Sequence, residues 1–216
     1  ETRLEHEQCL EKYGKTPLAV LDQYGVWERG GTAAHCVWVS DEDMDLMARK
    51  HVTAVHNPVS NLKLGSGVAR VPQLLKAGVN VALGTDGVSS NNNADLFEEI
   101  KLAAILHKGV NLDPMTVTAH QALEMATVNA ARALGRNTGV IAPGKIADLI
   151  LVDFTRPGLT PCHDVEENLA FAARGADVSM NMARGKIIYE KGEFLTLDLE
   201  QIRSEVENYA LPRIFG

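Results

Sequence analysis

Residues 80–93, NVALGTDGVSSNNN, decide how this chain is interpreted, because a short apolar strand runs directly into a carboxylate set between glycines. The strand is predicted over residues 79–84, and Asp86 follows it. An Asp–Gly pair after a strand is typical of a turn or a helix cap, and such a residue needs no further role. Any further role for Asp86 depends on what ends the neighbouring strands.

Two other apolar runs, residues 31–37 and 52–56, also end in polar side chains. His35 closes the first run, and His56 and Asn57 close the second. Helical patterns separate the runs, so they predict a parallel sheet covered by helices. In such α/β sheets ligands bind beyond the carboxyl ends of the strands. The sequence therefore predicts a single mouth shared by imidazole and carboxylate groups.

Helices and a second group of strands complete the predicted organisation. Thr16–Pro17 and the capping box beginning at Ser40 are helix start signals. Helices are predicted over residues 3–13, 17–24, 41–50, 70–77, 94–108, 116–134 and 198–209, and antiparallel strands over 147–153, 176–185 and 186–194, with a hairpin turn near Arg184–Gly185.

The composition restricts the class of protein. The chain has 216 residues, of which 45% are hydrophobic, enough for a sizeable core. Its formal net charge of −7 argues against a nucleic-acid or anionic-membrane partner. The three cysteines have no CxxC spacing, so we expect reduced thiols and a cytoplasmic location.

The chain opens at Glu1 without an initiator Met, and three strands are too few to close a (β/α)8 barrel. We therefore expect a piece of a longer protein whose amino-terminal segment is missing. A piece without catalytic activity of its own is the alternative.

Each candidate residue also has an ordinary structural explanation. His35 could be a hydrogen-bonded core histidine, and His56 precedes an Asn–Pro turn signal. The loop 60–67, SNLKLGSG, could be a simple connector. A phosphate-binding loop is the weaker alternative, because the P-loop spacing is absent. Imidazole and carboxylate groups at successive strand ends are, however, suitable ligands and bases for a divalent metal and its activated water. The other histidines are interpreted as solvated or structural: His6, His51, His107, His120 and His163.

Residues 33–67, AAHCVWVSDEDMDLMARKHVTAVHNPVSNLKLGSG, and 80–103, NVALGTDGVSSNNNADLFEEIKLA, closely resemble the amidohydrolase superfamily. Within it they resemble the branch of the methylthioadenosine/S-adenosylhomocysteine deaminases, guanine deaminase and triazine hydrolases, and are most similar to the first of these. Residues 144–153, GKIADLILVD, resemble the family's β-sandwich unit.

The resemblance implies an α/β fold made of the carboxyl-terminal part of a metal-dependent (β/α)8 TIM-type barrel and part of a small β-sandwich domain. The expected division is residues 1–138 for the barrel part, 139–195 for the sandwich portion, and 196–216 for a closing helix and tail.

The resemblance also assigns roles to individual residues. Asp86 matches the aspartate that binds the metal and shuttles the proton of the attacking water. His35 matches the histidine that hydrogen-bonds this water and stabilises the tetrahedral intermediate. Glu1, followed by Thr2, matches the glutamate of the H-x-x-E-T motif, which relays a proton to the purine ring. Substrate-binding residues are then Glu1, His35, Asp86 and Asn61, with His56 also in the pocket wall.

The implied activity is metal-dependent deamination of methylthioadenosine or S-adenosylhomocysteine to an inosine-type product and ammonia. Asp86 is the one expected metal ligand within the chain. The cofactor is one divalent ion, zinc, with iron, nickel or manganese as alternatives. The implied partners are a small nucleoside, further copies of the protein in a homo-oligomer, and the missing amino-terminal segment. Another nitrogen-heterocycle aminohydrolase or chlorohydrolase is the alternative activity.

Overall fold

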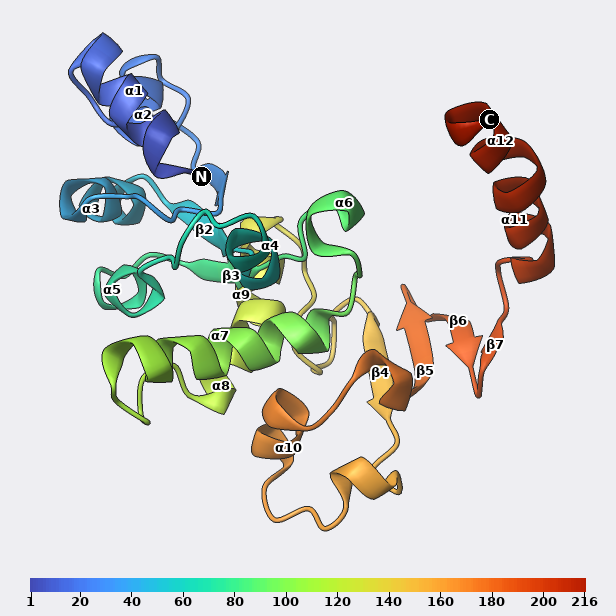
Figure 1. Cartoon of the computed structure of the whole chain (residues 1–216). Helices are drawn as coiled ribbons and strands as arrows, with labels where there is room; N and C mark the ends of the chain where they lie inside the picture. The colour runs from blue at the N-terminus through green and yellow to red at the C-terminus, as the bar shows by residue number, and fades with distance from the viewer.

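A parallel sheet of three strands lies at the centre of the first part of the chain (Figure 1). The computed structural model describes all residues from Glu1 to Gly216. The strands β1 (Gly31–Ala34), β2 (Val52–His56) and β3 (Val81–Leu83) lie side by side in chain order. Ala33 pairs with Ala54, and His56 pairs with Leu83, with both pairings parallel. The predicted α/β class and parallel arrangement are therefore confirmed.

Helices pack on this sheet and bury their apolar faces against it. In α3 the capping box of Ser40 and Asp43 begins the helix, and Met44 and Met47 are buried in the shared core. Helix α8 contacts both α7 and β3. The helices of this part are α1 (Arg3–Tyr13), α2 (Pro17–Gln23), α3 (Asp41–Arg49), α4 (Pro58–Lys63), α5 (Val71–Lys76), α6 (Val88–Asn91), α7 (Leu96–Asn111), α8 (Ala119–Ala126) and α9 (Val128–Ala133).

The helix predicted over residues 116–134 is broken into α8 and α9, so that part of the prediction is wrong. Thr127 lies between them with φ −122° and ψ −92°, far from helical geometry. The loop at Gly139 packs against this break, where an added Cβ would lie 2.9 Å from the Thr127 carbonyl oxygen. Close packing with a later loop therefore accompanies the interruption.

A second, antiparallel sheet follows, in the order β4 (Leu149–Val152), β5 (Val178–Ala183), β6 (Lys186–Glu190) and β7 (Glu193–Phe194). The predicted hairpin is confirmed, since Ala183 pairs with Lys186 across a turn at Arg184 and Gly185. Both turn residues have positive φ, as the twist of a tight hairpin requires.

Between β4 and β5 the chain forms the short turns η1 (Pro157–Leu159) and η2 (Gly175–Asp177) and the helix α10 (Val165–Phe171). Helix α10 packs on α7 and α8, and its Ala170 belongs to the same core as they do. The boundary at residue 138 stays a prediction.

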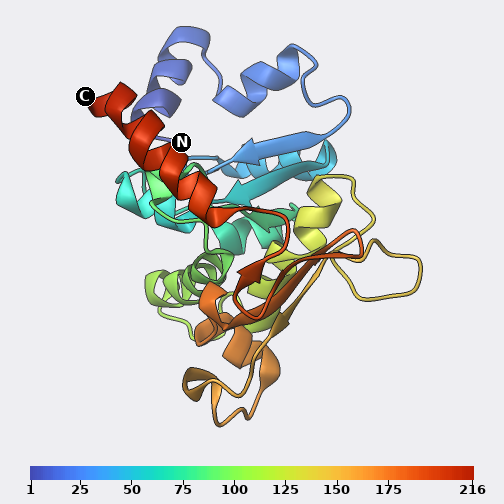
Figure 2. The same ribbon diagram turned by 90° about the vertical axis from the view of Figure 1, so that its right-hand side faces the viewer.

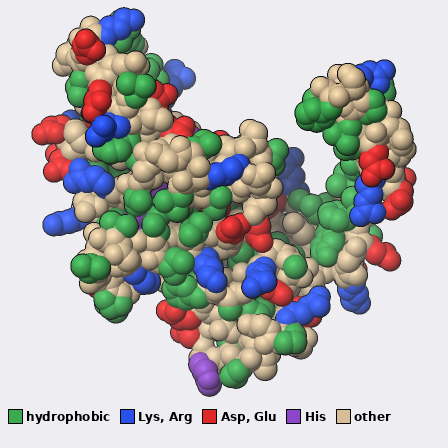
Figure 3. Space-filling view, in the orientation of Figure 1, with side chains coloured by type: hydrophobic (Ala, Val, Ile, Leu, Met, Phe, Trp, Pro, Cys, Tyr) green, Lys and Arg blue, Asp and Glu red, His purple; other side chains and the backbone are tan.

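The chain ends in a helical arm of α11 (Leu199–Glu205), the π-helical turn η3 (Val206–Ala210) and α12 (Leu211–Phe215). Figure 2 shows this arm running back toward the side of the molecule where the amino terminus lies. Hydrophobic side chains lie along it in the space-filling view (Figure 3). The exposed hydrophobic residues of the arm include Ile202, Val206 and Phe215. No helix of the chain combines the length and the apolar character that crossing a membrane requires.

Candidate active site

Asp86 follows β3 at the carboxyl edge of the parallel sheet, with its side chain held by hydrogen bonds. The hydroxyl of Ser60 donates to Oδ2 at 2.7 Å, and that of Ser90 donates to the same atom at 2.8 Å. The backbone N–H of Gly87 donates to Oδ1 at 2.7 Å. These bonds, led by that of Ser60 and followed by those of Ser90 and Gly87, lower the pKa of Asp86 to about 2. Asp86 is therefore an exposed, ionised carboxylate at neutral pH.

His35 follows β1 at the same edge, and two buried asparagines face its ring. Nδ1 of His35 lies 2.8 Å from Oδ1 of Asn61 and 3.5 Å from Nδ2 of Asn57. The shorter contact assigns the proton to Nδ1, because an amide oxygen only accepts. Nε2 is then left on the other side of the ring, free to accept a hydrogen bond from water in the neutral form.

Glu1 lies next to His35. Its Oε2 is 3.5 Å from Nε2 of His35, and its Oε1 accepts a 2.6 Å hydrogen bond from the hydroxyl of Ser66. The structure therefore brings Glu1 and His35 together. Asp86 lies in the same region, because Asn61 contacts His35 and the adjacent Ser60 bonds Asp86.

The two other residues predicted for the pocket wall are buried. Asn61 is 1% exposed and contacts His35, so any contact with substrate stays a prediction. His56 lies beneath the site, with its Nε2 3.4 Å from Nε2 of His107 on α7. Burial, reinforced by His107, lowers the pKa of His56 to about 3, and burial lowers that of His107 to about 4. Both rings are neutral at neutral pH.

His35 and Asp86 share an unusual backbone conformation. Their φ angles are +67° and +61°, in the left-handed region that non-glycine residues seldom occupy. Such strained positions cluster at functional sites, where the surrounding structure holds them in place. At His35 the conformation also ends the strand, so β1 stops at Ala34, short of the predicted residue 37.

A further carboxylate, Glu99 on α7, lies below the site and was not among the predicted residues. It is fully buried, its Oε1 accepts from Nδ2 of Asn91 at 2.6 Å, and its Oε2 accepts from the backbone N–H of Val59 at 3.3 Å. Burial raises the pKa of Glu99. Its signal in the sequence is a charge on the same helical face as Ala103 and His107, which are also buried.

Sequence reasoning also missed the serines that contact the predicted catalytic side chains. Ser60 and Ser66 lie in the stretch interpreted as a connector or a phosphate cradle, although its first half is the helix α4. Ser90 lies in the short helix α6, which was expected to be a loop. Serines are common in turns, so only their place beside Asp86 and Glu1 distinguishes these three.

The chain offers few side chains that could bind a metal ion. No group of three or more His, Cys, Asp or Glu side chains in this chain is arranged to hold a metal ion. Asp86, ionised and exposed at the mouth of the sheet, has the chemistry of one ligand to a divalent ion. The chain therefore fits a metal centre as the supplier of a single ligand.

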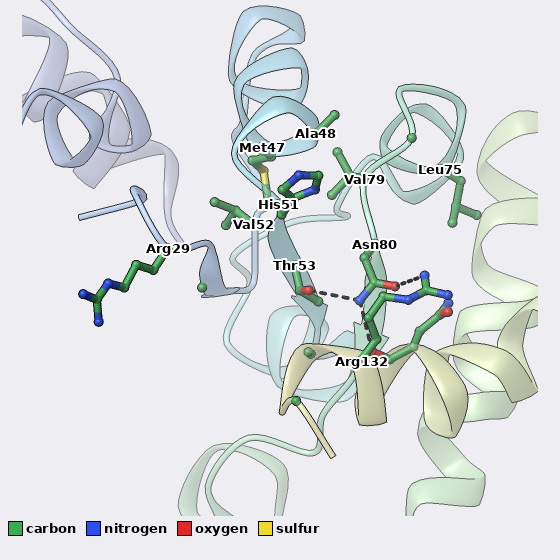
Figure 4. A pocket seen from close by; sticks show the side chains of 15 residues that line it. Arg29, Met47, Ala48, His51, Val52, Thr53, Leu75, Val79, Asn80 and Arg132 are labelled. Carbon is green, nitrogen blue, oxygen red and sulfur yellow. Dashed lines mark hydrogen bonds between the residues drawn. The ribbon is translucent and has the colours of Figure 1, made fainter. Parts of the chain in front are cut away.

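A cavity of about 580 Å³ lies at the opposite edge of the sheet, away from Asp86 (Figure 4). Residues at the amino ends of the strands line it, including Gly31, Val52 and Asn80. Asn80 donates to Thr53 at 3.0 Å and accepts from Arg132 at 3.0 Å, so its amide is used in structural bonds. Ligands of α/β sheets bind at the carboxyl edge, so we locate the candidate site at Asp86.

Comparison with known proteins gives a consistent result. The model of the amidohydrolase family matches residues 1–188. The 5-methylthioadenosine/S-adenosylhomocysteine deaminase of Moorella thermoacetica is 51% identical over 208 residues, which cover 95% of this chain and 49% of that protein. The 5'-deoxyadenosine deaminase of Methanosarcina acetivorans is 47% identical over 210 residues, covering 97% of this chain and 49% of the relative.

A solved structure also has a closely similar fold. The adenosine deaminase from Xanthomonas campestris with bound zinc superposes with a TM-score of 0.94 at 36% identity, covering 99% of this chain and 49% of that one. The resemblance to the superfamily and to its deaminase branch is thus confirmed. This chain spans about half the length of the relatives that it matches.

Proposed function

This chain belongs to the amidohydrolase family, and from that premise we propose that the complete protein hydrolyses the adenine amino group of a thioether adenosine, releasing ammonia. The substrates are 5-methylthioadenosine and S-adenosylhomocysteine, after the names of relatives about half identical to this chain. The observation that carries the proposal is the meeting of His35, Glu1 and an ionised Asp86 at the carboxyl edge of one parallel sheet.

The same proposal extends to the architecture. β1–β3 and their helices form the carboxyl-terminal part of a (β/α)8 barrel, and β4–β7 form part of a β-sandwich. The exposed edge strand β1 supports it, because exposed strand edges are normally paired or covered. The coverage of about half of each relative also supports it. The strands that close the barrel and the remaining metal ligands then come from a segment preceding Glu1.

The metal proposed for this site is zinc, with iron, nickel or manganese as alternatives. The similar adenosine deaminase structure with bound zinc supports this choice. A bound divalent ion acts as a Lewis acid and lowers the pKa of its water, which supplies the nucleophile at neutral pH.

The residues of this chain then divide the proton transfers between them. The Asp86 carboxylate, oriented by Ser60 and Ser90, accepts the proton of the attacking water. Nε2 of His35 accepts a hydrogen bond from the same water, which orients it, and then accepts one from the hydroxyl group of the tetrahedral intermediate. Glu1, held by Ser66, in its protonated form gives a proton to the purine ring nitrogen, which makes the amino-bearing carbon electrophilic. Asp86 then passes the water proton to the amino group, which leaves as ammonia, and the remaining hydroxyl proton returns to Glu1 as the carbonyl group forms.

Adenosines without the thioether are a second candidate. Relatives named 5'-deoxyadenosine deaminase are also closely similar to this chain. The two candidates differ in the 5' substituent, so a substrate panel decides between them. The complete protein is incubated with methylthioadenosine, adenosylhomocysteine, 5'-deoxyadenosine, guanine and a chlorotriazine, and kcat/KM is measured by ammonia or chloride release. The highest kcat/KM for a thioether adenosine is expected; a maximum for guanine or the triazine would contradict the proposal.

Two further features of the whole protein are proposals as well. A cytoplasmic location is supported by three free cysteines. A homo-oligomer is supported by apolar side chains exposed along the carboxyl-terminal arm, such as Tyr209 and Ile214. Light scattering of the complete protein measures the oligomeric state, and a monomer at all concentrations would contradict this part.

A further inference from the structure

The buried carboxylate of Glu99 has no cationic partner in the structure. A fully buried acidic side chain is rare unless it is paired with a cation, a metal or hydrogen-bond donors. Glu99 faces two N–H donors, from Val59 and Asn91, and no Lys, Arg or His lies within ion-pair distance. The bulk of α7 around it is apolar, with Ala103 and Ala104 in the core. A charge at this position needs an explanation beyond packing.

Each of the two donor residues is connected to Asp86 through the backbone or through a further hydrogen bond. Val59 precedes Ser60, and the Ser60 hydroxyl donates to Oδ2 of Asp86 at 2.7 Å. Nδ2 of Asn91 donates both to Glu99 and, at 2.7 Å, to the carbonyl oxygen of Thr85, the residue that precedes Asp86. One buried carboxylate thus holds the segment that bonds the Asp86 side chain and the segment that fixes its backbone.

We propose that Glu99 is a positioning residue for the Asp86 carboxylate, acting through Val59 and Ser60 on one side and through Asn91 and Thr85 on the other. The inference rests on the proposed function for its kinetic consequences. It adds to that function a residue that touches neither substrate nor metal. Asp86 sits at a strained positive φ, so its orientation depends on such external support.

The chemistry of the two donors explains why the residue is a carboxylate. A carboxylate accepts at both oxygens, so it satisfies Val59 and Asn91 together. Glutamine has the same volume but offers one oxygen and one NH₂ group, which would face a donor. Turning the Asn91 amide over to accept from that NH₂ group would remove its bond to Thr85. Glu99→Gln therefore loses at least one of the two connections without creating a cavity.

The test uses the complete, zinc-loaded protein with Glu99→Gln and, as its matched control, Glu98→Gln, which removes a charge from the exposed neighbour on the same helix. We expect kcat to fall about 10- to 100-fold in Glu99→Gln, with KM changed less than about threefold. Zinc should also be lost faster during dialysis against a chelator. The control should match the unmodified protein in all three measurements.

A double-mutant cycle with Ser60→Ala separates positioning from general stabilisation. If Glu99 acts through Ser60, its substitution costs less in the Ser60→Ala background than in the unmodified protein. Full additivity, or unchanged kcat and zinc retention in Glu99→Gln, would overturn the inference. If Glu99→Gln does not fold, Asn91→Ala breaks the second route and should give the same loss of kcat. Absence of ammonia release by the unmodified protein would refute the proposed function, while the zinc-retention comparison would still decide the role of Glu99.

Discussion

Oδ1 of the buried Asn61 lies 2.8 Å from Nδ1 of His35, so an amide oxygen fixes the ring orientation of a histidine at the mouth of the sheet. The two residues come from different elements, α4 and the end of β1. The contact holds the opposite ring nitrogen toward Glu1, whose Oε2 is 3.5 Å away. The tautomer of His35 is thus determined by a residue below the pocket surface.

Asn61→Ala removes this acceptor and should lower kcat about 10- to 100-fold, because His35 can then rotate and exchange tautomers. KM should change little if Asn61 does not touch the substrate. The measurement is steady-state ammonia release by the complete protein, with the exposed Asn208→Ala on the terminal arm as the control. A large rise in KM at unchanged kcat would instead assign Asn61 to substrate binding.

Asp86→Asn keeps the shape of the side chain and should still accept from Ser60, but it cannot accept the water proton at neutral pH. Turnover should fall at least about 100-fold, and zinc content should fall because a neutral amide is a weaker ligand. The exposed Asp45→Asn on α3 is the matched control. Near-normal turnover in Asp86→Asn would disprove the proposed mechanism.

His35→Ala should lower the rate by about two orders of magnitude or more with zinc largely retained, since His35 is assigned to hydrogen-bond the water and not the metal. The readouts are ammonia release and zinc content in the same preparation. A collapse of zinc content together with activity would make His35 a metal ligand.

Much of the three-stranded sheet and its helices could be predicted from the sequence, since the strands are short apolar runs between helical patterns. The ends of those strands were predicted less well, as β1 shows. His35 adopts a positive φ because of its surroundings, Asn61 and the neighbouring strand, and such tertiary constraints leave no local pattern. The break at Thr127 has the same origin, because it packs against a loop that begins about a dozen residues later.

The residues of the candidate site also fall into those that the sequence predicts and those that it does not. Asp86 and His35 were predicted because strand ends are readable and parallel strands bring their ends together. Ser60, Ser90 and Glu99 were not, because their roles depend on three-dimensional neighbours that sequence spacing does not reveal. Their partners are 26, 4 and 40 or 8 residues away along the chain, respectively.

Because His56 and His107 are buried together, we expect the folded protein to lose stability in mild acid. Their folded pKa values of about 3 and about 4 lie below the ordinary value of 6.5. Between about pH 6.5 and 4 the unfolded chain therefore binds protons that the folded chain does not, so stability falls as the pH is lowered and levels off below about 3. The thermal midpoint should drop by roughly 5–10 °C over this range.

His107→Gln tests this explanation, because it removes one of the two titrating rings and the like-charge neighbour of His56. The dependence of the thermal midpoint on pH should become shallower in this variant. The exposed His163→Gln should leave it unchanged. An equally steep dependence in His107→Gln would show that other groups cause the loss.

Gly84 links β3 to Thr85, and we expect its substitution by alanine to disturb the site sterically. A Cβ added there would lie 2.6 Å from Oδ1 of Asn57 and 3.0 Å from Cγ1 of Val55, so Gly84→Ala must displace the buried Asn57. Overpacking of this kind costs about 1–3 kcal/mol of stability. Since Asn57 also faces the ring of His35, kcat should fall as well.

Gly109→Ala is the matched control, because an added Cβ on this exposed residue of α7 meets nothing within 4 Å. It should be neutral or stabilising by up to about 1 kcal/mol, as alanine favours helix over glycine. Denaturant unfolding and ammonia release of the two variants separate the effects. If Gly84→Ala were as stable and as active as Gly109→Ala, Asn57 would be free to move, and its contact with the ring of His35 would not matter for turnover.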